Sequence, residues 1–274
     1  AGTSAIQAFH DRVHFDLERQ RVVHREALCA ALRGSPGTQI VLDDWVRVTD
    51  WRWNLTPLSP AGSVIGIGGR FKLGPALDRA RGQAFPALYL ARDVETTYLE
   101  YFGGDLTSTA GALTLGDLAL RRPSSFTTFV LRGCIENALD LREAHALTAF
   151  ARIIAKFSLS RDAERLRRRA NLKPRALIRT AAQLRQHALN PPSQWRAEPQ
   201  QCGIPAPGQM LGDFARAAGF DAILYPSQRG GRECLAVFPS NLRASDSWIE
   251  VVGERPPGSS WYRLDRHHAR DATE

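Results

Sequence analysis

Residues 220–227 read FDAILYPS, and residues 233–239 read ECLAVFP. Both runs are short and apolar, contain β-branched or aromatic residues, and are bounded by glycine or proline, which is typical of buried strands. We expect strands at 221–225 and 233–238, joined by a segment that contains Gly230 and Gly231. Residues 208–218 predict a helix before the first strand, with Gly219 in the C-terminal capping position. This part of the chain therefore predicts a fold that mixes helices and strands.

The same patterns extend outward along the chain. Apolar residues at helical spacing alternate with β-rich runs, and glycine or proline marks the loops between them. We expect further strands at 39–49, 87–91, 126–131, 135–141 and 248–252, and helices at 5–33, 95–102, 143–157, 160–170 and 174–188. The fold class is α+β.

Changes in composition divide the chain into three parts. Residues 1–44 form an N-terminal helical segment, and residues 45–255 form the central domain. Within that domain, residues from about 142 to 192 are rich in helical patterns and arginine, and we interpret them as a helical insertion. Residues 256–274 are polar and basic, and we expect a loose tail.

The composition is that of a globular protein of 274 residues with a formal charge of +8, mostly from arginine. Such a charge favours an acidic protein partner, a phosphorylated ligand or nucleic acid. No run of eighteen apolar residues predicts a membrane span. The N-terminus shows no signal pattern, and the four cysteines lie outside CxxC pairs. We expect reduced thiols and a cytoplasmic protein, acting in the producing cell or delivered into a target cell.

Four residues carry the candidate chemistry. Arg70 follows two glycines, Tyr89 lies on a predicted strand, Glu100 comes eleven residues later, and Ser227 follows a strand end. An arginine fork can hold a pyrophosphate, and an aromatic ring can cover a flat cationic ring. A carboxylate can stabilise the oxocarbenium formed when a glycosidic bond breaks. NAD presents all three of these targets.

Each residue also has an ordinary structural interpretation. Arg70 could face solvent after a tight turn, and Tyr89 could be a core residue. Glu100 could lie on the surface of a short helix, as we expect for Glu95. Ser227 lacks the Gly-x-Ser-x-Gly elbow of an acyl nucleophile, so we expect it to bond the ligand or to position Glu100.

Other charged residues give weaker signals. Arg47 and Arg52 lie upstream of the glycine turn, and either could help to hold the pyrophosphate. His10 and His14 are four residues apart on a predicted helix, but no third ligand is evident, so we expect no metal.

Taken together, these segments resemble the RES-domain toxins of bacterial toxin–antitoxin systems, a family named for an Arg, a Glu and a Ser. The matching segments are GGRF at 68–71, ALYLA at 87–91, Glu100 and DAILYPS at 221–227, and QWRA at 194–197 is similar to another family stretch. The resemblance covers roughly residues 45 to 245.

The resemblance implies an ADP-ribosyltransferase-like core, in which two small twisted β-sheets form an NAD cleft surrounded by helices. It implies a toxin that cleaves the nicotinamide–ribose bond of NAD by hydrolysis, phosphorolysis or ADP-ribosyl transfer to a protein. NAD is then a substrate and not a recycled cofactor. Tyr89, Glu100 and Ser227 are the implied catalytic residues, and Arg70 and Tyr89 bind the substrate. The implied partner is an acidic antitoxin or immunity protein.

This chain departs from the family pattern just after the arginine. Family members usually have Trp and then Asn, where this chain has Phe71 and Lys72. These differences leave the acceptor and the detailed shape of the pocket open.

The arginine-rich helix at 161–169 has three interpretations. It could be a solvated face, a docking surface for an acidic partner, or a nucleic-acid contact. No aromatic residue is interleaved with these arginines to stack on bases. The alternative to an NAD-cleaving toxin is a basic nucleic-acid-binding module without catalysis.

Overall fold

The sheet is built around the two strands predicted at 221–225 and 233–238. In the computed structural model, which describes residues 2–78, 84–102, 125–190 and 196–268, both predicted strands are present. β4 (Ala222–Pro226) pairs antiparallel with β5 (Glu233–Val237), and β2 (Leu88–Ala91) lies on the other side of β5. The strand predictions at 221–225, 233–238 and 87–91 are therefore confirmed to within one residue at each end.

Two long strands close this sheet on itself. β1 (Thr38–Asp50) lies beside β2, and β3 (Phe126–Asp140) lies beside β4. β1 and β3 also pair antiparallel along most of their length, so the order β1-β2-β5-β4-β3 returns to β1. β6 (Trp248–Val251) and β7 (Arg263–Leu264) continue outward from β3.

The mixed α and β architecture is confirmed, but the arrangement of the strands differs from the expectation. The seven strands in the described part of the chain form one hydrogen-bonded sheet, in which β1 to β5 close on themselves, and not two small separate sheets. The physical reason is the length of β1 and β3, which span 13 and 15 residues. Strands of this length pair with each other and still reach neighbours on their other edges.

Alternation along the strands gives the sheet two buried faces. On β2, Leu88 and Leu90 join a cluster with side chains from the other strands, including Leu131, Leu224 and Leu235. Tyr89 and Ala91 point the other way and pack with a second cluster that contains residues of the helices. Side chains alternate between the two faces of a strand, so the four residues of β2 contribute side chains to both hydrophobic clusters.

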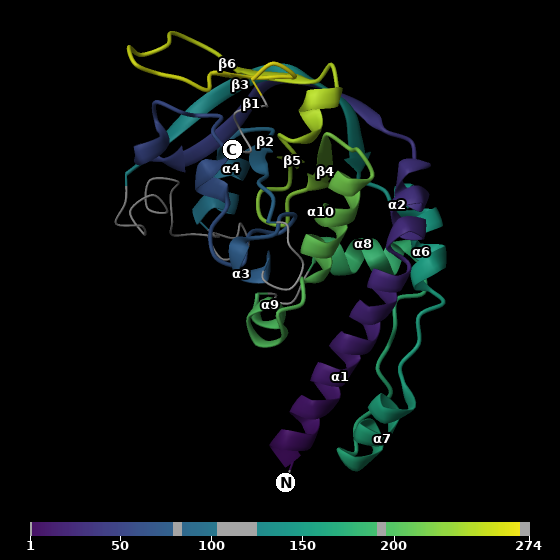
Figure 1. The fold of residues 1–274 in the computed structure, drawn as a ribbon. Helices are drawn as coiled ribbons and strands as arrows, with labels where there is room; N and C mark the ends of the chain where they lie inside the picture. Colours follow the sequence, from purple (N-terminus) through teal and green to yellow (C-terminus); the bar gives the residue numbers. More distant parts are fainter. Residues whose placement is uncertain (1, 79–83, 103–124, 191–195, 269–274) are drawn as a thin grey trace.

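Helices cover the second face. Figure 1 shows α2, α6, α8 and α10 grouped on one side of the sheet, with α3 and α4 on the other side of the view. The helices are α1 (Gly2–Val23), α2 (Arg25–Arg33), α3 (Pro75–Asp78), α4 (Val94–Phe102), α6 (Thr148–Ile154), α7 (Arg161–Arg169), α8 (Ala181–Leu189), α9 (Ala197–Cys202) and α10 (Pro207–Ala217). Short 3-10 turns occur at Trp51–Trp53, Ala61–Ser63, His145–Leu147 and Asn241–Ala244.

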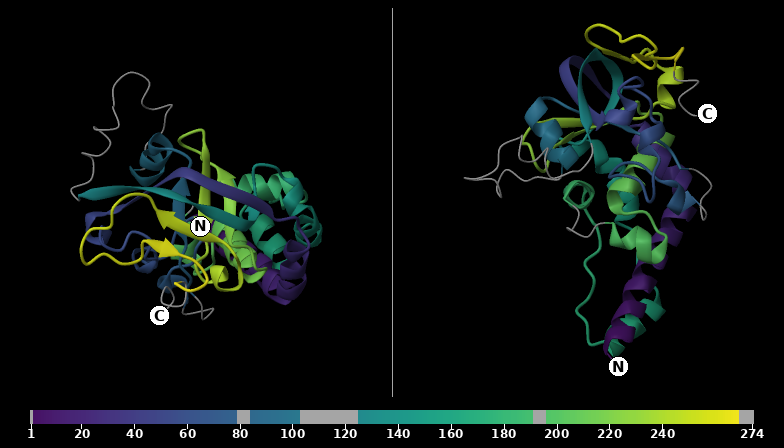
Figure 2. Two further views of the ribbon diagram at one scale, coloured as in Figure 1. Left: turned by 90° about the horizontal axis from the view of Figure 1, so that it is seen from above. Right: turned by 90° about the vertical axis from the view of Figure 1, so that its left-hand side faces the viewer.

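α1 and α7 project from the body as a helical arm, as Figure 1 and the right-hand view of Figure 2 show. Polar contacts join the two. The Ser160 backbone N–H donates to Asp16 Oδ2 at 2.8 Å, and the Gln20 amide donates to the Ser158 carbonyl at 2.8 Å. Part of the expected helical insertion therefore packs on the N-terminal helix.

Two helix predictions need correction. The single helix expected at 5–33 is interrupted at His24, and α2 then buries Leu28 and Leu32 in the core. The helix expected from Pro174 begins only at Ala181, because Thr180 supplies a better start. Its hydroxyl accepts from the Gln183 N–H while the Gln183 side chain accepts from the Thr180 N–H, which is a capping box.

The two strands expected at 126–131 and 135–141 are one strand, β3. The polar interruption between them lies on the strand, since β1 and β6 both pair with this part of it. A Cβ on Gly133 would lie 2.2 Å from the Trp248 carbonyl oxygen. Glycine at this position therefore allows β6 to approach closely.

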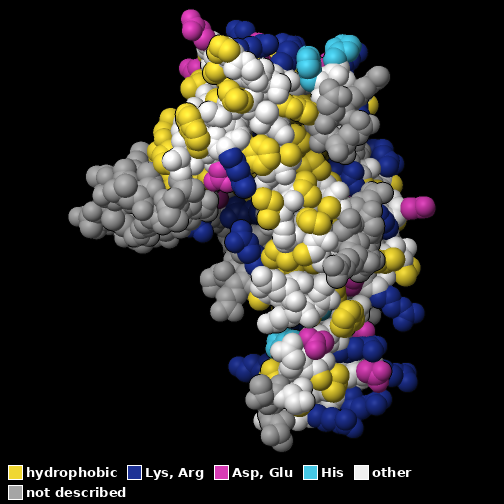
Figure 3. Space-filling model, turned by 60° about the vertical axis from the view of Figure 1, so that its left-hand side comes forward, with side chains coloured by type: hydrophobic (Ala, Val, Ile, Leu, Met, Phe, Trp, Pro, Cys, Tyr) yellow, Lys and Arg dark blue, Asp and Glu magenta, His cyan; other side chains and the backbone are white. Residues whose placement is uncertain are grey.

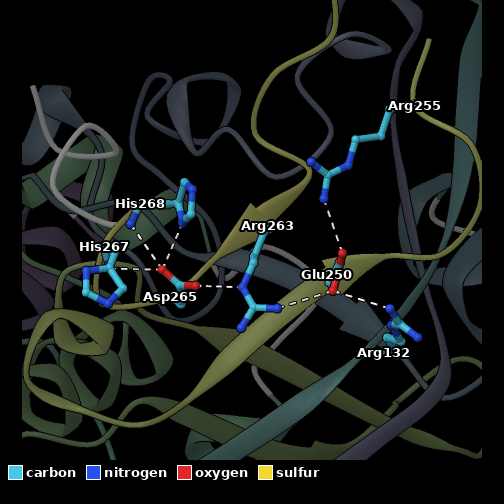
Figure 4. Close-up of polar contacts among 7 residues, drawn as sticks. All are labelled: Arg132, Glu250, Arg255, Arg263, Asp265, His267 and His268. Atoms are coloured by element: carbon cyan, nitrogen blue, oxygen red, sulfur yellow. Dashed lines mark hydrogen bonds and ion pairs between the residues drawn. The ribbon is translucent and has the colours of Figure 1, made fainter.

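The tail expected to be loose after Pro256 is ordered up to residue 268. Tyr262 and Leu264 are buried, and β7 pairs with β6. Polar contacts hold this end of the chain, as Figure 4 shows. Arg263 bridges Glu250 at 3.3 Å and Asp265 at 2.6 Å, and His268 Nδ1 lies 2.9 Å from Asp265 Oδ1. The remaining tail residues, 269–274, lie outside the described part of the chain.

The domain boundary expected at residue 44 falls inside β1, and Leu28 of α2 shares a core with Ala236 of β5. Along the described ranges, no helix is both long enough and apolar enough to cross a bilayer.

α10 packs very closely on the turn that carries Arg70. A Cβ on Gly208 would lie 2.7 Å from the Arg70 carbonyl oxygen, and one on Gly212 would lie 2.2 Å from that of Phe71. Between these glycines, the buried amide of Gln209 donates to the Ile67 carbonyl at 2.7 Å and to the Lys72 carbonyl at 3.3 Å. The helix therefore holds the turn through direct contact with its backbone.

This packing predicts that Gly212→Ala destabilises the fold. Alanine favours a helix interior by about 1 kcal/mol relative to glycine. The added Cβ would overlap a backbone oxygen, and overpacking of this kind costs about 1–3 kcal/mol or more. We expect the free energy of unfolding, measured by urea denaturation, to fall.

Gly34→Ala is the matched control. Its Cβ would lie 3.6 Å from the Ala30 carbonyl oxygen, which is an ordinary contact. The φ of Gly34 is −80°, which alanine adopts freely, so this variant should be as stable as the parent protein or slightly more stable. Equal stability of the two variants would contradict the proposed packing of α10 on the turn.

Candidate functional site

A cavity of about 610 Å³ opens beside β2 and α4. Arg70, Tyr89 and Glu100 line it, and Ser227 lies directly behind Glu100. The four residues predicted from the sequence are therefore brought together from the glycine turn, β2, α4 and the end of β4.

Glu100 and Ser227 form the central contact of the site. The Ser227 hydroxyl donates to Glu100 Oε1 at 2.7 Å. Its oxygen accepts the backbone N–H groups of Arg229 at 3.0 Å and Gly230 at 2.9 Å. The Ser227 hydroxyl donates its proton to the carboxylate, and its oxygen accepts hydrogen bonds from two backbone N–H groups. Ser227 is therefore arranged to position Glu100 and not to attack a substrate.

The loop after β4 also fixes the start of α4. A Cβ on Gly230 would lie 2.5 Å from Thr96 Cα, so the two backbones are in direct contact. The Thr96 N–H is capped by Asp93 Oδ1 at 2.7 Å. Tyr98 points away from the cavity and places its hydroxyl 3.1 Å from Thr128 Oγ1. Tyr98 and Glu100 therefore lie on different faces of α4, as predicted.

Tyr89 presents a neutral phenol to the cavity. Its hydroxyl oxygen accepts the Phe71 backbone N–H at 3.0 Å. Burial raises the pKa of Tyr89 to about 12, so the side chain keeps its proton at neutral pH. Because the N–H of Phe71 occupies one lone pair of the oxygen, the phenol proton is available to a ligand in the cavity.

Arg70 offers an unused donor at the cavity wall. Gly68, at φ +92°, gives the turn a backbone conformation that other residues rarely adopt. The Arg70 guanidinium carbon lies 5.7 Å from the centre of the Tyr225 ring. Its Nη1 is buried and has no hydrogen-bond partner in the described part of the chain. A buried guanidinium N–H without a partner is costly, and an anionic ligand would satisfy it.

Arg47 and Arg52, the two further arginines predicted to hold a pyrophosphate, are placed elsewhere. Arg47 Nε donates to the Pro57 carbonyl at 2.9 Å, and burial lowers its pKa to about 10. Arg52 is exposed, pairs with Asp50 at 3.2 Å and lies over the Trp53 ring at 5.4 Å. Neither is among the described residues that line the cavity.

Lys72, Arg196 and Arg229 also line the cavity, and the sequence interpretation did not assign them to the site. Arg196 lies in the QWRA stretch, so its position did carry a signal, although Gln194 and Trp195 fall outside the described residues. Lys72 is a departure from the family pattern, and Arg229 follows Ser227 by two residues. Their convergence depends on the tertiary fold.

Lys72 is an unusual cation. Its Nζ lies 5.5 Å from the centre of the Tyr89 ring. Burial, with Arg47 and Arg196 nearby, lowers the pKa of Lys72 to about 8. The preceding residue, Phe71, is fully buried and packs edge-on against Tyr225 with ring centres 4.9 Å apart. Phe71 therefore anchors the turn in the core while Lys72 faces the cavity.

The other candidate groups show no comparable arrangement. Burial raises the pKa of the Cys234 thiol far above its usual value, so it is not a thiolate nucleophile. Within the described ranges, no group of three or more His, Cys, Asp or Glu residues could hold a metal. His14 instead lies 4.0 Å from Glu198.

Figure 3 shows several groups of Lys and Arg side chains on the visible face. One group of Lys and Arg side chains is recessed near the middle of the visible face, and another surrounds the lower end, where α1 and α7 lie. On α7, Glu164 pairs with Arg167 at 2.7 Å and with Arg168 at 3.0 Å. Part of the charge of the arginine-rich helix is therefore balanced within the helix itself.

Comparisons with known proteins complete this description. No curated protein sequence matches the chain. A solved structure similar to it is that of the M. tuberculosis MbcT–MbcA toxin–antitoxin complex, at 17% identity, covering 77% of this chain and 81% of that chain, with a TM-score of 0.39.

The model of the RES domain family matches residues 144–257. The matched segment contains Ser227 and most of the expected helical insertion. It begins after Arg70, Tyr89 and Glu100, whose place in the family pattern rests on the sequence resemblance. The match confirms the resemblance predicted from the sequence: residues 144–257 of this chain match the RES domain.

Proposed function

We propose that this protein is a bacterial toxin that cleaves the nicotinamide–ribose bond of NAD. The observation that carries the proposal is one cavity that contains an unpartnered guanidinium nitrogen of Arg70 and the Ser227-bonded carboxylate of Glu100. The first is suited to a pyrophosphate and the second to a developing cationic sugar. The acceptor is water, phosphate or a protein side chain, and NAD is consumed as a substrate.

Binding is assigned to the turn and the aromatic rings. Arg70 bonds the pyrophosphate, with its guanidinium oriented by the Tyr225 ring. The phenol proton of Tyr89 bonds a ribose hydroxyl or the nicotinamide amide. The cavity volume of about 610 Å³ is within the range of sites that take ligands of this size.

The chemical step is assigned to Glu100. When the glycosidic bond breaks, its electron pair passes to the nicotinamide nitrogen, which becomes neutral, and positive charge develops on the ribose. A fixed carboxylate stabilises that charge more in the transition state than in the ground state. The Ser227 hydrogen bond holds the carboxylate in place, so little reorganisation is needed during the reaction.

An antitoxin or immunity protein is the proposed partner. The match of residues 144–257 to the RES domain and the net charge of +8 support a partner with an acidic surface. We place the activity in the cytoplasm, where NAD is available, either in the producing cell or in a target cell.

The first prediction is that the purified protein releases nicotinamide from NAD. Reactions with and without phosphate and with and without cell lysate would identify the acceptor from the products. No nicotinamide at micromolar protein in any of these reactions would refute the proposal. Binding to nucleic acid that collapses between low and physiological salt would then favour the non-catalytic alternative.

The second prediction separates Glu100 from Glu95. Glu100→Gln keeps an oxygen that can accept from Ser227 but removes the charge, so turnover should fall about a hundredfold or more. The affinity for NAD, measured by calorimetry, should change much less. Glu95 is exposed on the same helix, and Glu95→Gln should remain active. Normal turnover in Glu100→Gln would show that the proposed carboxylate mechanism is wrong.

The third prediction concerns Arg70. Arg70→Ala should weaken NAD binding, since each charge-assisted hydrogen bond lost contributes about 1.5–3 kcal/mol. Arg70→Lys should restore binding only in part, because a point charge cannot reproduce the fork. Calorimetric titration of both variants with NAD tests this. Unchanged affinity in Arg70→Ala would move the pyrophosphate to another cation of the cavity.

A further inference from the structure

We propose that the helical arm carries a second binding site, formed by residues 173–178 and an apolar cavity that they help to line. Its occupant is an acidic, extended segment of a protein partner. The segment pairs with the backbone of 173–178 and inserts one aliphatic side chain into the cavity. The inference gives the acidic partner of the proposed function a docking site, and it rests on that proposal for the role of the partner alone.

The apolar cavity has a volume of about 90 Å³ and is bordered by α1, α6 and α10. Leu17, Phe157 and Met210 are among the apolar side chains that line it. A cavity of this size has room for a single aliphatic side chain and is too small for a dinucleotide. None of its described lining residues lines the candidate NAD cavity, so the two sites are separate.

Residues 173–178 present an unpaired backbone beside this cavity. Figure 1 and the right-hand view of Figure 2 show the segment between α7 and α8 running back along the arm as neither helix nor strand. Four of its residues, 175–178, line the cavity. Within the described ranges, the backbone N–H and carbonyl groups of 173–178 form no hydrogen bond with another part of the protein. An open segment of this kind is a template for an added strand.

The other connection to α7 shows the contrast. There the Ser158 backbone N–H donates to the Gln20 side chain at 3.0 Å, and the Gln20 amide donates back to the Ser158 carbonyl at 2.8 Å. α1 therefore satisfies the backbone of that connection, whereas residues 173–178 are left to pair with something outside the chain.

Positive charge surrounds the open segment. Residues 161–180 contain eight Lys or Arg residues and two Asp or Glu residues. Both carboxylates are already paired within α7. Asp162 pairs with Arg165 at 3.1 Å, and Glu164 pairs with Arg167 at 2.7 Å. In the described part of the chain, no hydrogen bond or ion pair involves the side chains of Arg161, Arg169, Lys173 and Arg175. These unbalanced cations favour a segment rich in Asp or Glu.

Arg175 brings this charge to the edge of the cavity. Its side chain is exposed, and its charge lies close enough to His14 to add to the lowering of that pKa by burial. Glu198 is the one carboxylate among the described lining residues, and it lies 4.0 Å from His14. An acidic segment can therefore contact Arg175 while an adjacent aliphatic side chain enters the cavity.

Other occupants fit these features less well. A second copy of the chain would bring a net charge of +8 against a basic surface. A nucleic acid would match the charge, but phosphates and stacking bases make no use of an aliphatic cavity or of unpaired backbone groups. The combination of charge, backbone and cavity therefore favours an acidic peptide segment.

The experiment uses a short synthetic peptide with a central leucine, a valine on each side of it and two glutamates at each end. Its binding to the parent protein is measured by fluorescence anisotropy, and we expect a Kd of about 100 µM or tighter. Replacing the leucine by aspartate should weaken binding about tenfold or more, since burial of the leucine is lost. N-methylation of the central amides should also weaken it, because strand pairing is lost. The same peptide with lysine in place of glutamate should not bind.

Two variants of the protein test the two parts of the site. Ala176→Trp places a large ring at an exposed position of the cavity wall and should weaken binding about tenfold or more. Arg175→Glu reverses the charge at the cavity edge and should weaken it about fivefold or more. The matched controls are Ala27→Trp and Arg33→Glu, at exposed positions of α2 away from the cavity lining, and both should bind as the parent protein does.

The peptide results decide the proposal directly. Lack of binding of the acidic peptide overturns it, as does equal binding of the lysine peptide or unchanged binding in Ala176→Trp. Binding of a single-stranded oligonucleotide that Arg175→Glu weakens, without binding of the acidic peptide, would assign the arm to nucleic acid instead.

Addition of NAD separates this site from the proposed function. Because no described residue lines both cavities, saturating NAD should leave the affinity for the peptide unchanged. Loss of peptide binding in the presence of NAD would contradict the assignment to the arm. Peptide binding with the expected variant effects supports the docking site even if NAD is not cleaved. Cleavage of NAD without peptide binding supports the proposed function and overturns the docking site.

Discussion

The site depends on the contact between α10 and the backbone of the turn that carries Arg70. Gly208 and Gly212 allow the helix to touch that backbone, and Gln209 bonds two of its carbonyl groups. Phe71 anchors the same turn in the hydrophobic core. Because both neighbours of Phe71 are thereby fixed, Arg70 and Lys72 can present cations to a partly buried cavity despite their like charge.

A second contact joins parts of the chain that lie far apart in sequence. The Ser227–Glu100 hydrogen bond spans 127 residues, and Gly230 places the loop after β4 against the start of α4. The closed sheet sets this geometry, since β2 and β4 both pair with β5. The cationic turn and the carboxylate therefore reach one cavity from a shared scaffold.

Local patterns predicted most elements, and the errors have identifiable causes. The strands at 221–225 and 233–238 were recognised from apolar runs bounded by glycine and proline, which are strong local signals. The start of α8 was placed at Pro174 because the Thr180–Gln183 capping box was not weighed against it. The tail after Pro256 was expected to be loose because its composition is mostly polar. Tyr262 and Leu264 are nevertheless buried, because β7 pairs with β6.

The sequence by itself predicted the mixed α and β fold class, the resemblance to the RES domain, and the presence of Arg70, Tyr89, Glu100 and Ser227 in segments of strand, helix and turn. These predictions follow from local spacing and residue chemistry, which the linear sequence contains. The tertiary structure decided that β1 and β3 close one sheet, that Arg47 is bonded to backbone carbonyls, and that Lys72 and Arg196 enter the cavity. Those outcomes depend on burial and on distances between remote segments, and apart from the QWRA stretch that contains Arg196, no local pattern encodes them.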